Sequence, residues 1–415
     1  IRFDQAISGG SWTQAAFPVL MTSTYASMFG GCLGPLHPGR PSPVEALAAQ
    51  GYATAGFSTS PLLSREYAYD RGFDHFVDLI PGEKDPWLRR IKGGQRLLRS
   101  PLIQGIADRF GRPMRPTRVY CSAEDVIDQV EAWLSSVTSP FFLWAHFMDT
   151  HWPYHLEEEL REPHEVAQAW TDLATMHKAN WRGNRIPEGL RKRFIPLYER
   201  SLAHVDGRVG RMCPILDEAG LSSNTVVIIV SDHGEEFLDH GRWGHWENNL
   251  CDEILRVPMI ITSPNLRRAQ IARDQVSTLA IMPTVLQFAG CPPPEGMLGT
   301  PIDLERLDDQ ASSSPAPAIS EMWRDEWHRV SVRTKEFKLL WDSQTPDQLE
   351  LFDLRAGPDE KRDVSRDHPN VVRVLKEYLE SHLERVKRTR SSGPAAEPFL
   401  EQETVERLRS LGYIE

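Results

Sequence analysis

Residues 225–245 read TVVIIVSDHGEEFLDHGRWGH, and this stretch decides the fold. Its first six residues are all β-branched and five of them are apolar, which is typical of a strand that is covered on both faces. A carboxylate and an imidazole, Asp232 and His233, follow directly, and Gly234 is expected to let the backbone turn away. The alternative is a surface turn with ordinary hydrogen-bonding residues. We predict a buried strand that delivers two metal-binding side chains to its carboxyl end.

Similar apolar runs predict further buried parallel strands, at 51–58, 141–148 and 257–262. Patterns of helical period separate them, at 42–50, 122–137, 191–219 and 278–288. This alternation predicts an α/β fold with a doubly wound, mostly parallel sheet, in which ligands bind beyond the carboxyl ends of the strands. Polar residues 58–60 and 149–151 follow two of the strands, so we expect them at the same edge as Asp232.

The pattern changes in the last quarter of the chain. Residues 1–308 are predicted to form the catalytic α/β domain, and 309–318, rich in Ser, Ala and Pro, a linker. Residues 319–390 alternate as antiparallel strands do and then form an amphipathic helix, so they predict a small sheet-plus-helix subdomain. Residues 391–415 are expected to be a flexible tail with a short terminal helix.

The composition excludes several classes of protein. The chain has 415 residues, of which 40% are hydrophobic and 25% charged, a balance typical of folded globular proteins. The formal charge of −11 argues against a nucleic-acid partner, which needs a basic face. No apolar run is long enough for a transmembrane helix. The five cysteines are widely spaced and lack a C-x-x-C pair, so we expect free thiols in a reducing compartment.

Two other positions are candidates for chemistry. Thr13 precedes an apolar helical stretch at 15–29, where a divalent cation would favour the alkoxide and make it a nucleophile; the alternative is a plain helix cap. His151, beside Trp152, is a candidate to bind an anionic oxygen or to protonate a leaving group; the alternative is a structural histidine packed by Trp152. The mixed oxygen and nitrogen ligands at 232–233 favour Mn, Zn or Fe over Ca.

Together these residues resemble the sulfatase family of the alkaline phosphatase superfamily. The signature lies in 231–237, 240–245 and 256–258, with weaker landmarks at 3–8, 13–23, 51–52, 71–74, 149–154, 281–284, 351–354 and 411–413. The resemblance implies an alkaline phosphatase-like fold and one divalent metal, with Mn or Zn favoured and Ca or Mg open. It implies a metal-dependent hydrolase that attacks phosphorus or sulfur in line, forms an ester at the nucleophile and releases it with water.

The resemblance also implies a role for each site residue. Thr13 falls on the nucleophile and on a metal ligand, and Asp232 and His233 fall on metal ligands. His151 and His245 fall on catalytic positions that contact the charged oxygens or the leaving group of the substrate. Ser60 stands in the region where the family often has a substrate-contacting Asn.

The sequence departs from the family at the nucleophile. Sulfatases that use formylglycine have a C/S-x-P-x-R pattern, whereas residues 13–17 read TQAAF. We therefore expect no formylglycine and favour phosphodiester or phosphonate ester substrates over sulfate esters. The alternatives are a phosphoglycerol-type transferase and a catalytically impaired protein that binds anionic glycans or lipid head groups.

The family's first strand ends in one or two metal-binding Asp residues and would precede Phe3. Asp4 lies inside the next predicted strand and is not expected to replace them. We expect a truncated sequence, a wrongly assigned start or a degraded enzyme, with one central strand missing from the sheet. The oligomeric state stays open, and so does the localisation, for which the cytoplasm is slightly favoured.

Overall fold

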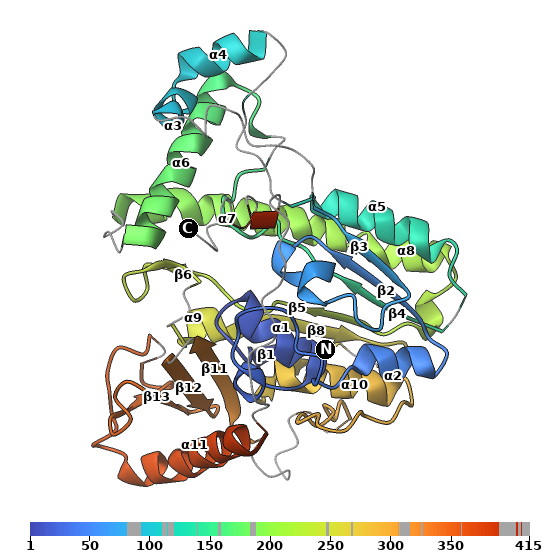
Figure 1. Ribbon diagram of the computed structural model, residues 1–415, viewed down its shortest axis with the longest axis vertical. Helices are drawn as coiled ribbons and strands as arrows, with labels where there is room; N and C mark the ends of the chain where they lie inside the picture. Colours follow the sequence, from blue (N-terminus) through green and yellow to red (C-terminus); the bar gives the residue numbers. More distant parts are fainter. Residues whose placement is uncertain are drawn as a thin grey trace.

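A computed structural model gives the fold (Figure 1). The structure describes residues 1–80, 93–109, 114, 120–138, 140–156, 159–182, 188–245, 249–266, 269–305, 307, 316–324, 327–357, 359–389, 404–405 and 408.

A five-stranded mixed sheet forms one half of the core. Its order is β10 (Val276–Ser277), β1 (Arg2–Ile7), β8 (Arg256–Thr262) and β5 (Val227–Val230), and β9 (Ile271–Ala272) also pairs with β1. β1 is parallel to β9 and β10, but β8 is antiparallel to both β1 and β5. The prediction of a parallel strand at 257–262 was therefore wrong, although a strand does lie there. The strand predicted at 225–230 is β5, but its neighbour β8 is antiparallel and Ile229 is 42% exposed, so β5 is not a parallel strand covered on both faces. Alternate residues of β8 are buried, as in a strand with one covered face.

A three-stranded parallel sheet forms the other half, in the order β3 (His75–Asp78), β2 (Ala53–Ser58), β4 (Phe141–Ala145). β2 is parallel to both neighbours, which confirms the parallel strands predicted at 51–58 and 141–148. Within the described residues of the predicted catalytic domain, the strands thus form two main sheets and a two-stranded one, β6 (Glu236–Phe237) with β7 (Trp243–Gly244), rather than the single sheet that the sequence predicted.

Helices cover both faces, which confirms the doubly wound arrangement (Figure 1). α1 (Thr13–Thr22) packs against alternate residues of β4, Phe142 and Trp144. α5 (Ala123–Leu134) and α8 (Met212–Glu218) pack against the intervening residues, Phe141 and Leu143. Because successive strand residues point to opposite faces, these helices lie on opposite sides of β4. α2 (Pro43–Ala49) and α10 (Ile281–Phe288) pack together in a cluster with Phe142, on the side of α1.

The predicted helices differ from the structure mainly at their ends. The Ser42 hydroxyl accepts a hydrogen bond of 3.2 Å from the Glu45 N–H and caps α2. The region predicted at 191–219 is two helices, α7 (Glu188–Val209) and α8. α1 ends at Thr22, because Ser23 adopts a left-handed conformation with φ 53°, and a short 3₁₀ helix, η1 (Ala26–Phe29), follows.

The C-terminal subdomain is an antiparallel sheet with one helix, as predicted. The sheet order is β11 (Ala318–Arg324), β12 (Trp327–Arg333), β13 (Phe337–Asp342), β14 (Leu349–Asp353), and α11 (Pro369–Thr389) packs on it. β11 was not predicted as a strand. Residues 309–315 of the predicted linker and most of the predicted tail at 391–415 lie outside the described residues, so these boundaries stay predictions.

β11 attaches the subdomain to the loop between β1 and α1. The Ser320 hydroxyl donates a hydrogen bond of 2.6 Å to the carbonyl of Ser8. The N–H of Glu321 donates one of 3.0 Å to the carbonyl of Gly9. Four residues after Gly9 the chain reaches Thr13, so the subdomain braces the loop that carries the predicted nucleophile.

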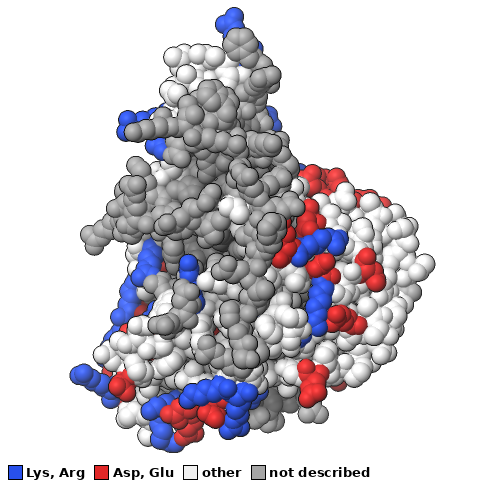
Figure 2. Space-filling view, viewed as in Figure 1, with Lys and Arg blue, Asp and Glu red and all other residues white. Residues whose placement is uncertain are grey.

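A helical arm projects from the body (Figure 1). It contains α3 (Gly94–Leu98), α4 (Pro101–Arg109) and α6 (Pro163–Arg182). None of the helices that the structure describes is both long and apolar enough to cross a membrane. On the face shown in Figure 2, the described basic and acidic side chains are interspersed rather than gathered by sign. All five cysteines are free thiols, as expected.

Candidate active site

Five predicted site residues line one pocket: Thr13, His151, Asp232, His233 and His245. Thr13 follows β1, His151 follows β4, and Asp232 and His233 follow β5. β1 and β5 run in the same direction because each is antiparallel to β8. The fold therefore brings these side chains together at the carboxyl ends of the strands.

Thr13 is the first residue of α1 and is buried. The N-cap position belongs to Trp12, so Thr13 is not the capping residue. Its Oγ1 lies 3.4 Å from Nε2 of His233, although 220 residues separate the two in the sequence. The hydroxyl thus faces the predicted metal ligands.

The hydrogen bonds of His233 fix the role of each ring nitrogen. Nδ1 lies 2.9 Å from the carbonyl oxygen of Gly234, to which only an N–H can donate. Nε2 therefore carries the lone pair, and burial lowers the pKa of this imidazole. Oδ2 of Asp232, another acceptor, lies 3.4 Å from Nε2.

Two acceptors that face each other without a hydrogen between them repel, and a cation relieves the repulsion. The oxygen of Asp232, the nitrogen of His233 and the hydroxyl of Thr13 form a mixed donor set that suits Mn or Zn. The residues present therefore fit the divalent metal that the sequence predicted.

Gly234 is required for a different reason from the predicted turn. Its φ is not in the left-handed region, so a side chain is compatible with its backbone conformation. A Cβ atom at this position would lie 2.2 Å from the carbonyl oxygen of Glu253, and the Gly234 N–H donates a hydrogen bond of 2.7 Å to Ile254. The hydroxyl of Ser8 also hydrogen-bonds the carbonyl of Asp232. Close packing, rather than a special φ, fixes the metal-binding loop.

His245 is paired with a carboxylate that the sequence analysis did not single out. Nδ1 of His245 lies 3.0 Å from Oε1 of Glu235, and both side chains are buried. Burial opposes the charged form of His245, but the Glu235 carboxylate outweighs it and raises the pKa of the imidazole. Glu235 thus favours the protonated, cationic form of His245 in the pocket.

His151 has the opposite character. Its Nδ1 donates a hydrogen bond of 2.8 Å to the carbonyl of Trp152, so Nε2 is an acceptor in the neutral ring. Burial and the neighbouring His245 lower the pKa of His151 to about 3. The ring stacks on Trp152 and its centroid lies 5.2 Å from that of His245. Trp152 therefore packs His151, as the structural alternative expected, and holds it in the pocket.

His146 lines the pocket and was missed by the sequence analysis. It follows β4 within a run that was interpreted only as a buried strand. The Thr59 hydroxyl donates its only hydrogen to the His146 carbonyl at 3.1 Å. It must therefore accept the second hydrogen bond, which His146 Nδ1 donates at 3.2 Å. Burial lowers the pKa of this imidazole to about 4. A histidine after an apolar strand was the available signal.

Four polar residues of the predicted edge, Ser58, Thr59, Ser60 and Asp149, do not line the pocket. Ser60 is buried beyond the end of β2, where its neighbour Thr59 contacts His146 instead. The predicted contact of Ser60 with the substrate stays a prediction. Asp149 accepts a hydrogen bond of 3.2 Å from the N–H of Ala123 and so fixes the start of α5.

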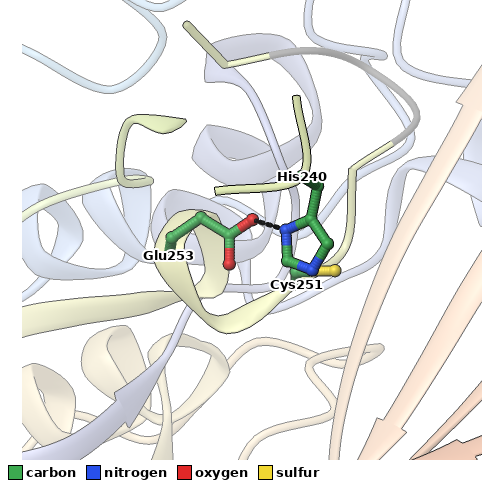
Figure 3. A group of neighbouring side chains, drawn as sticks. All are labelled: His240, Cys251 and Glu253. Carbon is green, nitrogen blue, oxygen red and sulfur yellow. Dashed lines mark hydrogen bonds and ion pairs between the residues drawn. The ribbon is translucent and has the colours of Figure 1, made fainter. Parts of the chain in front are cut away.

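His240, part of the same sequence signature, forms a second cluster with Cys251 and Glu253 (Figure 3). Its Nδ1 lies 2.6 Å from Oε1 of Glu253, and its Nε2 lies 3.0 Å from the carbonyl oxygen of Asp359. His240 does not line the pocket. His240 therefore connects residues 231–245 to the C-terminal subdomain.

The chain matches two sequence models of known families. Residues 1–291 match the sequence model of the family described as "Sulfatase", and residues 241–389 match "N-sulphoglucosamine sulphohydrolase, C-terminal". Arylsulfatase K of Gallus gallus is 25% identical over 347 residues, which are 73% of this chain and 62% of that protein. The chain spans less than two thirds of the length of the first curated relatives that it matches.

Two solved structures share the fold. BT4656, in complex with its substrate D-glucosamine-2-N,6-O-disulfate, has a TM-score of 0.68 and 17% identity, covering 93% of this chain and 91% of its own. The phosphonate monoester hydrolase of Agrobacterium radiobacter has a TM-score of 0.65 and 16% identity, covering 94% and 88%.

Proposed function

Since the chain belongs to the sulfatase family, we propose that it is a metal-dependent ester hydrolase in which Thr13 is the nucleophile. The favoured substrates are monoanionic esters of phosphoric or phosphonic acid. The observation that carries the proposal is the 3.4 Å approach of the Thr13 hydroxyl to the lone pair of His233, beside Asp232.

A divalent cation held by Asp232 and His233 would favour ionisation of the Thr13 hydroxyl, whose proton passes to the solvent, and would stabilise the negative charge of the transition state. The Thr13 oxygen attacks phosphorus in line, a bond from Oγ1 to phosphorus forms, and the bond to the leaving oxygen breaks. His245, cationic because of Glu235, donates a proton to the leaving oxygen, which departs as an alcohol.

Water then attacks the phosphorus of the covalent ester and displaces Thr13. His245, which lost its proton in the first step, takes the proton of this water and becomes cationic again. His151 is neutral and its Nε2 is an acceptor, but its lowered pKa makes it a weak base, so it is suited to orient the water by accepting a hydrogen bond rather than to bind an anionic oxygen. The two histidines that the sequence placed in similar roles thus differ: His245 gives and takes a proton, and His151 accepts a hydrogen bond.

A sulfate ester is the second candidate substrate, since the relatives include sulfatases. Against it stands the single hydroxyl of Thr13, where formylglycine would present a hydrated aldehyde with two. Parallel assays with nitrophenyl phenylphosphonate, bis-nitrophenyl phosphate and nitrophenyl sulfate decide between these substrates. A kcat/KM for the sulfate at least equal to those of the phosphorus esters would overturn the favoured substrate class.

The nucleophile is tested with Thr13→Ala and Thr13→Ser. Loss of a covalent nucleophile and its ionised oxygen is expected to lower kcat by at least about 10³-fold in the alanine variant, whereas serine keeps measurable activity. Thr150→Ala, which changes another hydroxyl residue of the pocket, is the control. Peptide mass spectrometry after rapid acid quenching should find the phosphoryl or phosphonyl group on Thr13. Equal activity of wild type and Thr13→Ala would eliminate the proposal.

Two experiments separate the remaining alternatives. Adding glycerol or another alcohol to the assay gives a transferred product if the enzyme is a transferase, and only the free acid if water is the acceptor. Calorimetric titration with Mn and Zn tests the impaired-enzyme alternative, for which no metal binds at the site of Asp232 and no substrate turns over.

A further inference from the structure

Another cluster of metal-ligating side chains, different from that of His240, lies in the C-terminal subdomain, away from the pocket. Glu321 of β11, His328 of β12 and His382 of α11 offer ligand atoms that all lie within 4.8 Å of one another. All three residues are buried, and the carboxylate of Glu321 is fully enclosed. None of them lines the active-site pocket.

Three polar groups converge on one oxygen of this cluster. Oε2 of Glu321 lies 2.8 Å from His382 Nε2, 3.2 Å from His328 Nε2 and 2.7 Å from the Ser27 hydroxyl. A carboxylate oxygen has two lone-pair directions, so three donors exceed its capacity. A cation among the four atoms would let each contribute a lone pair instead.

The surroundings hold these ligands in place, as metal sites require. The other oxygen of Glu321 accepts a hydrogen bond of 2.7 Å from the Ser27 N–H, which leaves Oε2 directed at the histidines. The ring of His328 packs on Trp323 with centroids 4.6 Å apart. The ring of His382 meets the edge of Tyr25 at 4.8 Å. The ligands come from two strands and a helix rather than from loops.

We propose that Glu321, His328 and His382 bind a structural divalent transition metal, with zinc preferred and the Ser27 hydroxyl as fourth ligand. Two imidazoles and one carboxylate are a common zinc-binding set. Ligands about 2.0–2.1 Å from a tetrahedral zinc lie roughly 3.3 Å from one another, so the three contacts of Oε2, at 2.8, 3.2 and 2.7 Å, need to lengthen by at most about 0.6 Å. Because Ser27 belongs to η1, the ion ties the subdomain to the catalytic part.

The cluster of His240, Cys251 and Glu253 is less suited to a metal. Both ring nitrogens of His240 face oxygen acceptors, a carboxylate and a carbonyl, which protonated nitrogens satisfy completely. At Glu321 the nitrogens of two separate rings face one oxygen, so the ring nitrogens converge there rather than diverge.

The test measures metal content in the full chain after the catalytic ligands are removed. Asp232→Asn/His233→Gln protein is expressed with added zinc, dialysed against a weak chelator and analysed by plasma mass spectrometry. We expect one equivalent of zinc, and its loss when His382→Gln is added. His368→Gln, just before α11 and outside the cluster, should keep the ion. Cobalt substitution should give the visible absorption of a tetrahedral nitrogen–oxygen site.

The outcomes are distinguishable from those for the active site. A folded Asp232→Asn/His233→Gln chain without metal overturns this proposal, whatever the activity of the wild type. One equivalent in that chain supports it, even where Thr13 proves not to be the nucleophile. If His382→Gln does not fold, cobalt absorption of the chain with an intact cluster still decides, since its absence refutes the site.

Discussion

Replacing Gly234 by alanine tests whether packing fixes the metal-binding loop. The added Cβ would lie 2.2 Å from the carbonyl oxygen of Glu253 and 3.1 Å from its carbon. Both obstacles are backbone atoms, so no side-chain rotation relieves the clash. Ordinary contact requires the two segments to separate by about 1 Å, which also stretches the 2.7 Å hydrogen bond from Gly234 to Ile254.

The magnitude follows from these two effects. Overpacking of this kind costs about 1–3 kcal/mol, and the weakened hydrogen bond about 1 kcal/mol. We expect Gly234→Ala to lower the free energy of unfolding by about 2–4 kcal/mol. Because Asp232 and His233 directly precede Gly234, a shift of about 1 Å should also lower kcat/KM by about 10²-fold.

Denaturant titration followed by circular dichroism measures the stability, and hydrolysis of a nitrophenyl ester measures the activity. Gly207→Ala is the matched control, since Gly207 is exposed in α7 and a Cβ there meets nothing within 4 Å. That change should stabilise the chain by about 0.5–1 kcal/mol and leave activity unchanged. A Gly234→Ala variant as stable and as active as the wild type would refute the reasoning.

Further predictions concern charge, burial and metal. Glu235→Gln removes the carboxylate that raises the pKa of His245, so burial then lowers that pKa. Because the reaction requires the cationic ring, the fall in kcat/KM with rising pH should move to lower pH. A pH profile that does not move would contradict the role of Glu235. Lys338→Met leaves the buried carboxylate of Glu360 without its cation and Asp252 with Arg333 alone. It should lower the free energy of unfolding by about 3–5 kcal/mol, against less than about 1 kcal/mol for exposed Lys376→Met. Removal of metal by EDTA should abolish hydrolysis, and Mn or Zn should restore it; full activity in EDTA argues against a catalytic metal.

Much of the fold could be predicted because its signals are local. The apolar runs of β2, β4 and β5 and the capping serine of α2 appear directly in the sequence. The antiparallel direction of β8 could not be predicted. Its residues form a continuous apolar run, as in a buried parallel strand, although buried and exposed residues alternate along it in the structure. β11 begins directly after a Ser- and Pro-rich stretch, so the predicted end of the linker, residue 318, overlaps the first residue of this strand.

Five of the six predicted site residues lie together because each follows a strand, whereas Ser60 also follows a strand but does not line the pocket. Glu235 and His146 were missed for physical reasons. The pairing of Glu235 with His245 spans ten residues and depends on how the loop returns through β6 (Glu236–Phe237) and β7 (Trp243–Gly244). The role of His146 depends on Thr59, which lies on a different strand end. Pairings set by tertiary structure leave no periodic pattern in a single sequence.

The hydrogen bonds from Ser320 and Glu321 to the loop of Ser8 and Gly9 bear on how the chain can be divided. A protease cut within residues 309–315 would separate two pieces in sequence while leaving them bonded in space. An amino-terminal fragment expressed alone from a shortened gene would lack the partners of that loop, so it should not be active. Nicked protein, by contrast, should stay assembled and melt in one cooperative transition.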